Sequence, residues 1–160
     1  MDKRTLTPEL MDDPELDRDR HHEALRALAW LNGVTRNAAL AWAPLRALAR
    51  DQGVKELKVL DVATGAGDIP IRLFHRARKA GLKLQIEACD LSEQALEYAR
   101  ENAKRSGAEV RFLQHDVLDG PLPEGYDVVM CSQFMHHLEE PEAASLLRKL
   151  REAAGRQVIL

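Results

Sequence analysis

The chain has 160 residues, of which 45% are hydrophobic and 31% are charged, and its formal net charge is −3 at pH 7. This length fits one domain with a substantial core. The sequence contains no run of 18 apolar residues and no apolar segment near its start, so we expect a cytoplasmic protein without a membrane span. The negative net charge provides no general attraction to phosphate backbones and therefore counts against a nucleic-acid partner.

The two cysteines, Cys89 and Cys131, are too few for a disulfide framework, and they lack the spacing of zinc ligands. We therefore expect two free, buried thiols and no metal site.

Two helices are predicted before the first strand. Residues 1–13 are polar, a helix can begin at Pro14, and a second helix is predicted from Arg36 to Asp51 with Pro44 as a bend or break. Residues 1–53 thus form an N-terminal helical segment. It either packs on the sheet edge or lies over the ligand crevice as a lid.

The stretch from Leu57 to Pro70 predicts a strand, a glycine turn and a helix. An apolar run ends at Val62, residues 64–67 read Thr-Gly-Ala-Gly, and apolar residues then recur at helical spacing over 68–80. Glycines at 65 and 67 let a ligand approach the backbone, and a helix start favours a negatively charged group. The turn is therefore typical of a nucleotide-type binding site.

The residue at position 70 narrows the choice of nucleotide. A dinucleotide-binding fingerprint, Gly-x-Gly-x-x-Gly, would need glycine where this chain has Pro70, and no Gly-Lys-Ser or Gly-Lys-Thr of a P-loop follows. A nicotinamide-dependent Rossmann enzyme is therefore the least favoured interpretation.

A second strand is predicted over 82–90, where apolar residues alternate with polar ones up to Asp90. Asp90 follows Gly67 by 23 positions, close to the roughly 20 expected for a carboxylate that binds a ribose diol. Ser92 then caps a helix that ends at Ser106-Gly107. The alternative role for Asp90 is to cap this turn.

The remaining elements continue the alternation of strand and helix. Strands are predicted over 110–114, 126–131 and from Gln157, and a helix opens at Pro141 and is closed by Gly155. Such alternation predicts an α/β fold, an open parallel sheet flanked by helices, whose ligands lie over the carboxyl ends of the strands. The candidate residues that fall at such ends are Gly65, Gly67, Asp90, Asp116 and the 132–137 loop.

The pattern Asp61-x-Ala63-x-Gly65-x-Gly67 resembles motif I of the class I S-adenosylmethionine-dependent methyltransferases. The sequence Asp-Val-Ala-Thr-Gly-Ala-Gly-Asp at residues 61–68 resembles that of the quinone-biosynthesis methylases within that superfamily. The resemblance covers about residues 57–160 and implies a Rossmann-like domain over 54–160 with strand order 3-2-1-4-5.

The same resemblance implies which residues hold the cofactor, S-adenosylmethionine, and its product, S-adenosylhomocysteine. Asp61 and the turn would hold the methionine part. Asp90, at the end of the second strand, would bind the ribose hydroxyls, and Asp116, after the third strand, would bind the adenine amine. Each of these acids has a purely structural alternative, in a strand end or a turn. The implied cofactor-binding residues are Asp61, Ala63, Thr64, Gly65, Gly67, Asp90, Leu91, Asp116, Val117 and Cys131.

Methyl transfer from S-adenosylmethionine requires little acid–base catalysis by the protein, because the sulfonium methyl donor is already activated. His136 is the candidate general base, although paired histidines after strand four are common in similar families without that role. The segment Cys131-Ser132-Gln133-Phe134 lacks the Asn/Asp-Pro-Pro-aromatic signature typical of amino-group methylases that act on nucleic acids. This favours transfer to oxygen or carbon of a small, apolar acceptor.

Methyltransferases of this class continue past strand five, so the resemblance implies a chain truncated within that strand, without the C-terminal antiparallel pair. The sheet edge would then be exposed and available for a homodimer. The alternative function is a noncatalytic cofactor-binding or interaction domain derived from a methyltransferase.

Overall fold

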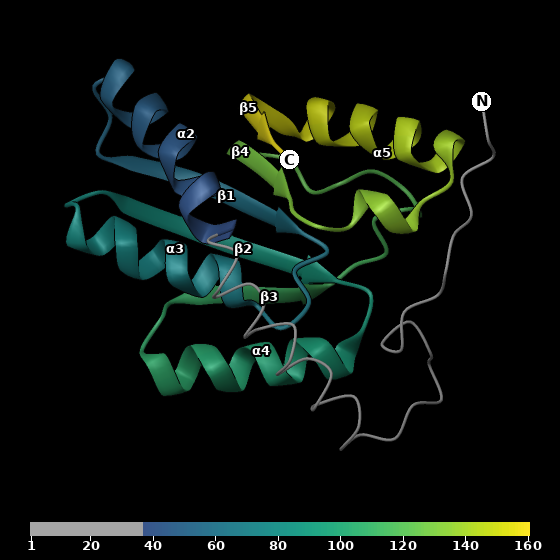
Figure 1. Cartoon of the computed structure of the whole chain (residues 1–160), viewed down its shortest axis with the longest axis horizontal. Coiled ribbons are helices and arrows are strands. Elements are labelled where there is room, and N and C mark those ends of the chain that lie inside the picture. Colours follow the sequence, from purple (N-terminus) through teal and green to yellow (C-terminus); the bar gives the residue numbers. More distant parts are fainter. Residues whose placement is uncertain (1–36) are drawn as a thin grey trace.

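The structure is a computed structural model that describes residues 37–160 (Figure 1). The helix predicted to begin at Pro14 lies outside the described residues, so it stays a prediction. The described elements are α2 (Asn37–Asp51), β1 (Glu56–Val62), α3 (Asp68–Lys79), β2 (Lys83–Asp90), α4 (Glu93–Ser106), β3 (Val110–Gln114), β4 (Tyr126–Cys131), the 3₁₀ helix η2 (Met135–His137), α5 (Glu140–Ala153) and β5 (Ala154–Ile159).

The five strands form one parallel sheet in the order β3-β2-β1-β4-β5, which confirms the predicted fold. β1 lies in the centre, and its last residue, Val62, pairs with Cys89 of β2 and Cys131 of β4. Because every pairing is parallel, the carboxyl ends of all five strands lie at one edge of the sheet. This edge is on the right-hand side of Figure 1.

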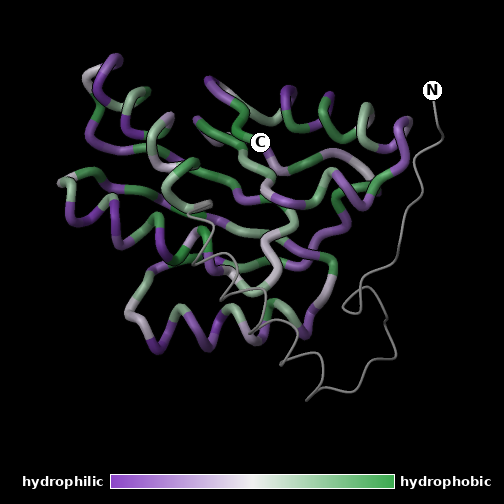
Figure 2. The backbone as a smooth tube through the Cα atoms, in the orientation of Figure 1, coloured by the Kyte–Doolittle hydropathy of each residue, from purple (hydrophilic) through white to green (hydrophobic). Residues whose placement is uncertain are grey.

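Two apolar layers hold the helices to the sheet. Leu57 and Val59 of β1 belong to a cluster with α2 and α3, whereas Leu60 and Val62 belong to a cluster with α5. This alternation follows from the two-residue period of a strand. α2 and α3 therefore cover one face and α5 the other, and Figure 2 shows hydrophobic residues concentrated along the strands and the helix sides that face them.

The caps predicted for α4 are present, and α5 begins with a capping box that was not predicted from the sequence. The Ala95 N–H donates to Ser92 Oγ at 3.2 Å at the start of α4, and Gly107 ends this helix in the left-handed region at φ +68°. At the start of α5 a capping box joins Glu139 and Glu142, and the Glu139 N–H donates to Glu142 Oε2 at 3.0 Å. Local hydrogen bonds thus fix where α4 and α5 begin.

α2 continues from Asn37 to Asp51 through Pro44, so of the predicted bend or break at this residue the break does not occur. Proline lacks the N–H that the carbonyl of Leu40, one turn earlier, would accept. Leu40 is 71% exposed, so water can reach this part of the helix and satisfy that carbonyl.

The prediction that Gly155 closes α5 is wrong. α5 ends at Ala153, and β5 begins directly at Ala154, ahead of the predicted strand start at Gln157. A Cβ at Gly155 would lie 3.0 Å from the Tyr126 carbonyl oxygen, so close approach to β4 requires this glycine.

Within the described residues, β5 pairs with β4 only, so its outer edge has no strand partner there. The homodimer through this edge stays a prediction. Among the described helices, none combines the length and the apolar character needed to cross a membrane.

Candidate functional site

The end of β1 turns sharply at the carboxyl edge of the sheet. Asp61 is 2% exposed, and its Oδ2 accepts a hydrogen bond from Thr64 Oγ1 at 2.6 Å. The Thr64 N–H donates to the Cys89 carbonyl at 2.9 Å, and the Gly67 N–H donates to the Thr64 carbonyl at 3.1 Å. The buried acid and the neighbouring strand thus hold the turn in place.

Ala63 adopts φ +56°, in the left-handed region that non-glycine residues rarely occupy. Such a conformation costs on the order of 1–2 kcal/mol and persists only where surrounding contacts impose it. A second residue of this kind, Gln133 at φ +57°, follows β4. Ala63 is the first residue after β1 and Gln133 the second after β4, at the same edge, and nothing in the sequence indicates this strain.

The two glycines of the turn have different surroundings. Gly65 adopts φ +55°, and a Cβ there would meet nothing within 4 Å. At Gly67, with φ +73°, a Cβ would lie 2.9 Å from Ala99 Cβ and 3.0 Å from the Phe112 ring. Gly65 therefore faces open space, where a ligand could approach, whereas Gly67 packs against α4 and β3.

Asp90 connects this turn to the end of β2. Its Oδ2 accepts from the Gly65 N–H at 2.8 Å, and its Oδ1 accepts from the Ser92 N–H at 2.9 Å. The turn-capping role weighed for Asp90 is therefore present. A carboxylate has about four lone-pair positions, so two remain for a ligand. Leu91, the next residue, is 61% exposed beside it.

The segment after β3 forms a turn around Asp116. The Leu118 N–H donates to Asp116 Oδ1 at 2.9 Å, so the structural role of this acid is also observed. Val117 is buried at 5% exposure. Lys149 of α5, which the sequence did not single out, donates to the carbonyls of Val117 and Leu118 at 3.1 and 2.7 Å and fixes this segment.

His115 joins the same region to β2, because its N–H donates to the Asp90 carbonyl at 3.0 Å. Its Nε2 is buried and has no hydrogen-bond partner among the residues that the structure describes. A buried nitrogen without a hydrogen-bond partner, such as His115 Nε2, lowers the stability of the folded state.

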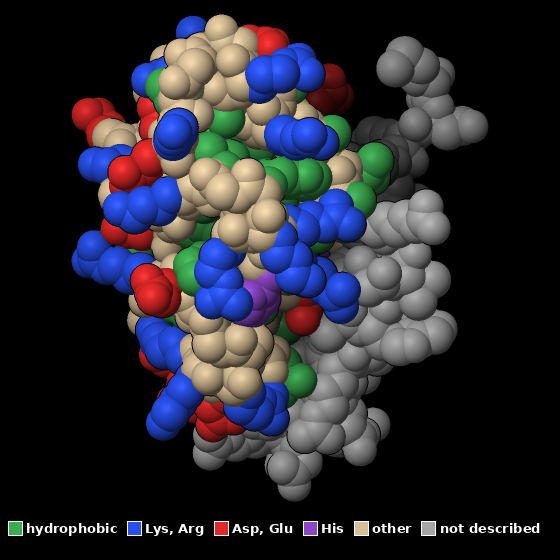
Figure 3. All heavy atoms as spheres, turned by 90° about the vertical axis from the view of Figure 1, so that its left-hand side faces the viewer, with side chains coloured by type: hydrophobic (Ala, Val, Ile, Leu, Met, Phe, Trp, Pro, Cys, Tyr) green, Lys and Arg blue, Asp and Glu red, His purple; other side chains and the backbone are tan. Residues whose placement is uncertain are grey.

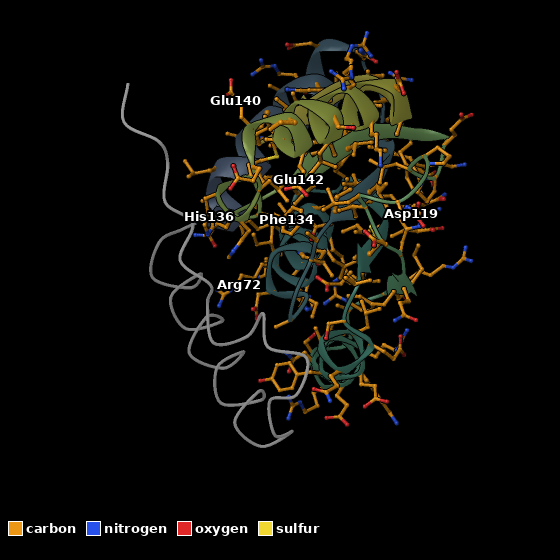
Figure 4. The ribbon with its side chains drawn as sticks, turned by 90° about the vertical axis from the view of Figure 1, so that its right-hand side faces the viewer. Arg72, Asp119, Phe134, His136, Glu140 and Glu142 are labelled. Atoms are coloured by element: carbon orange, nitrogen blue, oxygen red, sulfur yellow. The ribbon has the colours of Figure 1, made fainter. Side chains whose placement is uncertain are left out.

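The segment after β4 borders the edge from the other side. Cys131 is 1% exposed, and burial raises the pKa of its thiol to about 12, so it is neutral and can only form part of the wall. His136 is exposed in η2, where its ring lies against that of His137 in a tilted arrangement with centroids 4.0 Å apart. Figure 4 shows Phe134 and His136 on this end of the molecule, with Arg72 of α3 on the same side as His136 and Asp119 on the opposite side.

Burial dominates the electrostatics of the site. It raises the pKa of Asp61 from 3.8 to about 7; the hydrogen bond from Thr64 opposes the shift, and the charge of Asp90 adds to it. Asp68, the first residue of α3, also has a raised pKa because it is partly buried, and Arg72 opposes this shift. No group of three or more potential metal ligands occurs in the described part of the chain.

Residues 59–155, more than half of the chain, match the family described as "Methyltransferase domain". The chain belongs to this family. The resemblance to class I S-adenosylmethionine-dependent methyltransferases is thereby confirmed, together with the strand order that it implied.

Two curated relatives of this methyltransferase domain differ in what they are named for. A demethylmenaquinone methyltransferase of Thermus thermophilus is 34% identical over 64% of this chain and 46% of its own length. A release factor glutamine methyltransferase of Lactococcus lactis is 39% identical over 46% of this chain and 26% of its own length. The chain thus spans less than half the length of either relative.

The crystal structure of magnesium protoporphyrin IX methyltransferase from Synechocystis, with bound S-adenosylmethionine, matches this methyltransferase domain with a TM-score of 0.58. It is 20% identical, and the match covers 87% of this chain and 57% of that one. At this identity the match supports the fold alone.

Proposed function

We propose that this chain binds S-adenosylmethionine at the carboxyl edge of its sheet and transfers the methyl group to oxygen or carbon of a small-molecule acceptor, leaving S-adenosylhomocysteine. The observation that carries the proposal is the hydrogen bond from the Gly65 N–H to Asp90 Oδ2. It joins the motif I turn to the acid after β2 beside open space, where a ligand could contact both.

The roles of the side chains follow from their positions around this contact. Asp61 orders the turn through Thr64, while Ala63, Gly65 and Gly67 shape the backbone that receives the methionine part. The two free lone-pair positions of Asp90 accept from the ribose hydroxyls. The remaining proposed contacts come from exposed Leu91, from Asp116 with the adjacent Val117, and from the wall at Cys131.

The start of α3 supports a ligand without phosphate groups. A dinucleotide places its pyrophosphate at the helix N-terminus, where free N–H groups bind it. Here Asp68 puts a carboxyl at the first position of the helix, and Pro70 has no N–H to offer. S-adenosylmethionine carries no phosphate, so these residues do not oppose it.

When bound, S-adenosylmethionine supplies an already activated methyl group, so the protein contributes mainly by positioning. The wall after β4, with Phe134 beside η2, orients the acceptor, and we assign proton removal from it to His136.

A small apolar acceptor is supported by the name of one relative, a demethylmenaquinone methyltransferase. The segment Cys131-Ser132-Gln133-Phe134, without an Asn-Pro-Pro-aromatic pattern, agrees with oxygen or carbon as the methylated atom. A protein is the competing class of acceptor, because another relative is named a release factor glutamine methyltransferase.

The test is a methyl-transfer assay with S-adenosylmethionine labelled in its methyl group. Demethylmenaquinone and a release factor are offered separately, and label is counted in the organic extract and in the protein fraction. Label in the quinone supports the proposal, whereas label only in the release factor overturns the small-molecule acceptor. No label in either, with S-adenosylhomocysteine still bound, favours a noncatalytic binding domain.

A further inference from the structure

We propose a second binding site, for a small amphipathic monoanion, at the end of the sheet opposite the cofactor edge. β2 begins at Lys83, but β3 begins only at Val110, which pairs with Ile86. Residues 83–85 therefore have no neighbouring described strand on that side. A cavity of about 750 Å³ opens at this notch, within the range of about 300–1,000 Å³ typical of small-ligand sites.

The notch contains a backbone donor. The Lys83 N–H donates to the Lys55 carbonyl at 2.9 Å on the β1 side. Because backbone groups of successive strand residues point to alternate sides, the N–H of Leu84 points away from β1, toward the notch. No described residue accepts a hydrogen bond from it. An anionic oxygen entering the notch would satisfy this donor.

One of the cations that line the cavity is left for a ligand. Lys83 pairs with Glu56 at 2.9 Å, and Arg111 pairs with Glu87 at 3.0 Å. Arg78, at the end of α3, forms no ion pair with any residue that the structure describes. Its guanidinium carbon lies 5.8 Å from the centroid of the Phe74 ring. Arg78 therefore supplies a positive charge that is not held in an ion pair with a described residue, beside an aromatic surface.

The cavity walls suit an apolar body attached to that charge. Phe74 and Val110 are partly buried there, and Leu84 and Ile86 extend the apolar lining. Figure 3 views this end of the molecule, where Lys and Arg side chains surround exposed hydrophobic atoms. Glu109 also lines the cavity, and its charge favours a ligand with one negative charge over one with several.

The site is separate from the cofactor edge. α3 begins beside the glycine turn and reaches the notch with its last residues, and its 12 residues span about 18 Å. A ligand at Arg78 thus binds without touching the turn, and this inference does not depend on the proposed methyl transfer.

The experiment titrates the 160-residue chain with 2-naphthoate, a planar aromatic carboxylate, and with 2-naphthamide, its neutral analogue. Amide-resolved NMR follows the backbone N–H groups. We expect saturable binding of 2-naphthoate, with chemical-shift changes centred on the Leu84 N–H. The affinity for 2-naphthamide should be at least about tenfold lower, because a charge-assisted hydrogen bond is lost. Saturating S-adenosylhomocysteine should leave the naphthoate affinity unchanged.

Adjacent residues of α3 provide a matched control. Arg78→Glu should weaken naphthoate binding at least tenfold, while Lys79→Glu, the same charge change outside the cavity lining, should leave it within twofold. Glu109→Gln should strengthen binding. Absence of saturable binding, equal binding of the two naphthalenes, equal loss in both charge reversals, or displacement by S-adenosylhomocysteine would each overturn the proposal.

Discussion

Asp61 is an acid placed where water does not reach it. The carboxyl is 2% exposed, and the Thr64 hydroxyl at 2.6 Å compensates for only part of its lost hydration. Its neighbours Cys89 and Cys131 are buried too, and burial raises the pKa of each thiol to about 12. The two thiols beside Asp61 are therefore neutral at pH 7.

This burial makes the stability of the fold depend on pH in a definite direction. The pKa of Asp61 is raised from 3.8 to about 7, so the folded state binds a proton that the unfolded state releases. The stabilisation from Asp61 is complete below pH 3.8 and is lost as pH rises to 7, by an amount on the order of 4 kcal/mol.

Denaturant unfolding between pH 3.8 and pH 7 should show this loss of stability with rising pH in the wild type. In Asp61→Asn, whose side chain does not titrate, the loss should be absent. An unchanged pH slope in the variant would show that folding does not raise the pKa of Asp61.

The two glycines of the turn should separate stability from binding. Gly67→Ala introduces left-handed strain and contacts of 2.9–3.0 Å, and should lower the free energy of unfolding by roughly 2–4 kcal/mol. Gly65→Ala, with open space around its Cβ, should lose only about 1 kcal/mol. Calorimetry should nevertheless find weaker S-adenosylhomocysteine binding in Gly65→Ala. Equal destabilisation by both changes would contradict this division.

His136 should be tested apart from the ring that lies against it. If it removes the acceptor proton, His136→Gln should lower kcat about 10²-fold or more. His137→Phe keeps a ring beside His136 and should retain activity. An unchanged kcat in His136→Gln would leave His136 without a catalytic role.

At the scale of elements, β1 is the support for the whole carboxyl edge. It pairs with β2 and β4, and Asp127 of β4 reinforces it from the amino-terminal side. Asp127 Oδ2 accepts from the Lys58 N–H at 2.8 Å, and its Oδ1 pairs with Arg156 Nε of β5 at 2.8 Å. One side chain therefore links three neighbouring strands.

Removing this link should destabilise the sheet without changing the site. Asp127→Ala should cost about 1–3 kcal/mol, since a strand N–H and a guanidinium lose their acceptor. Asp51→Ala, which breaks an ion pair whose side chains are 76% and 64% exposed, should cost less than about 1 kcal/mol. Chemical denaturation of both variants compares them directly. Similar losses would show that the Asp127 contacts contribute no more than a surface pair.

Across the whole molecule, features that repeat along the chain were the ones that the sequence predicted. Alternating strands and helices gave the parallel sheet, and strand ends located Asp90 and Asp116. Contacts between distant segments were not predictable, because they depend on the assembled fold. These include the Lys149 link to Val117 and the close approach of Gly155 to Tyr126. The strain at Ala63 was also missed, since alanine has no preference for that conformation.

The central claim is that the edge around Asp90 binds S-adenosylmethionine. The most direct measurement is calorimetric titration with S-adenosylhomocysteine of the wild type, Asp90→Asn, and Asp119→Asn as a matched exposed control, with NAD as the competing ligand. We expect binding to the wild type and to Asp119→Asn, at least tenfold weaker binding to Asp90→Asn, and none of NAD. Binding of NAD, or equal S-adenosylhomocysteine affinity in all three proteins, would contradict the claim.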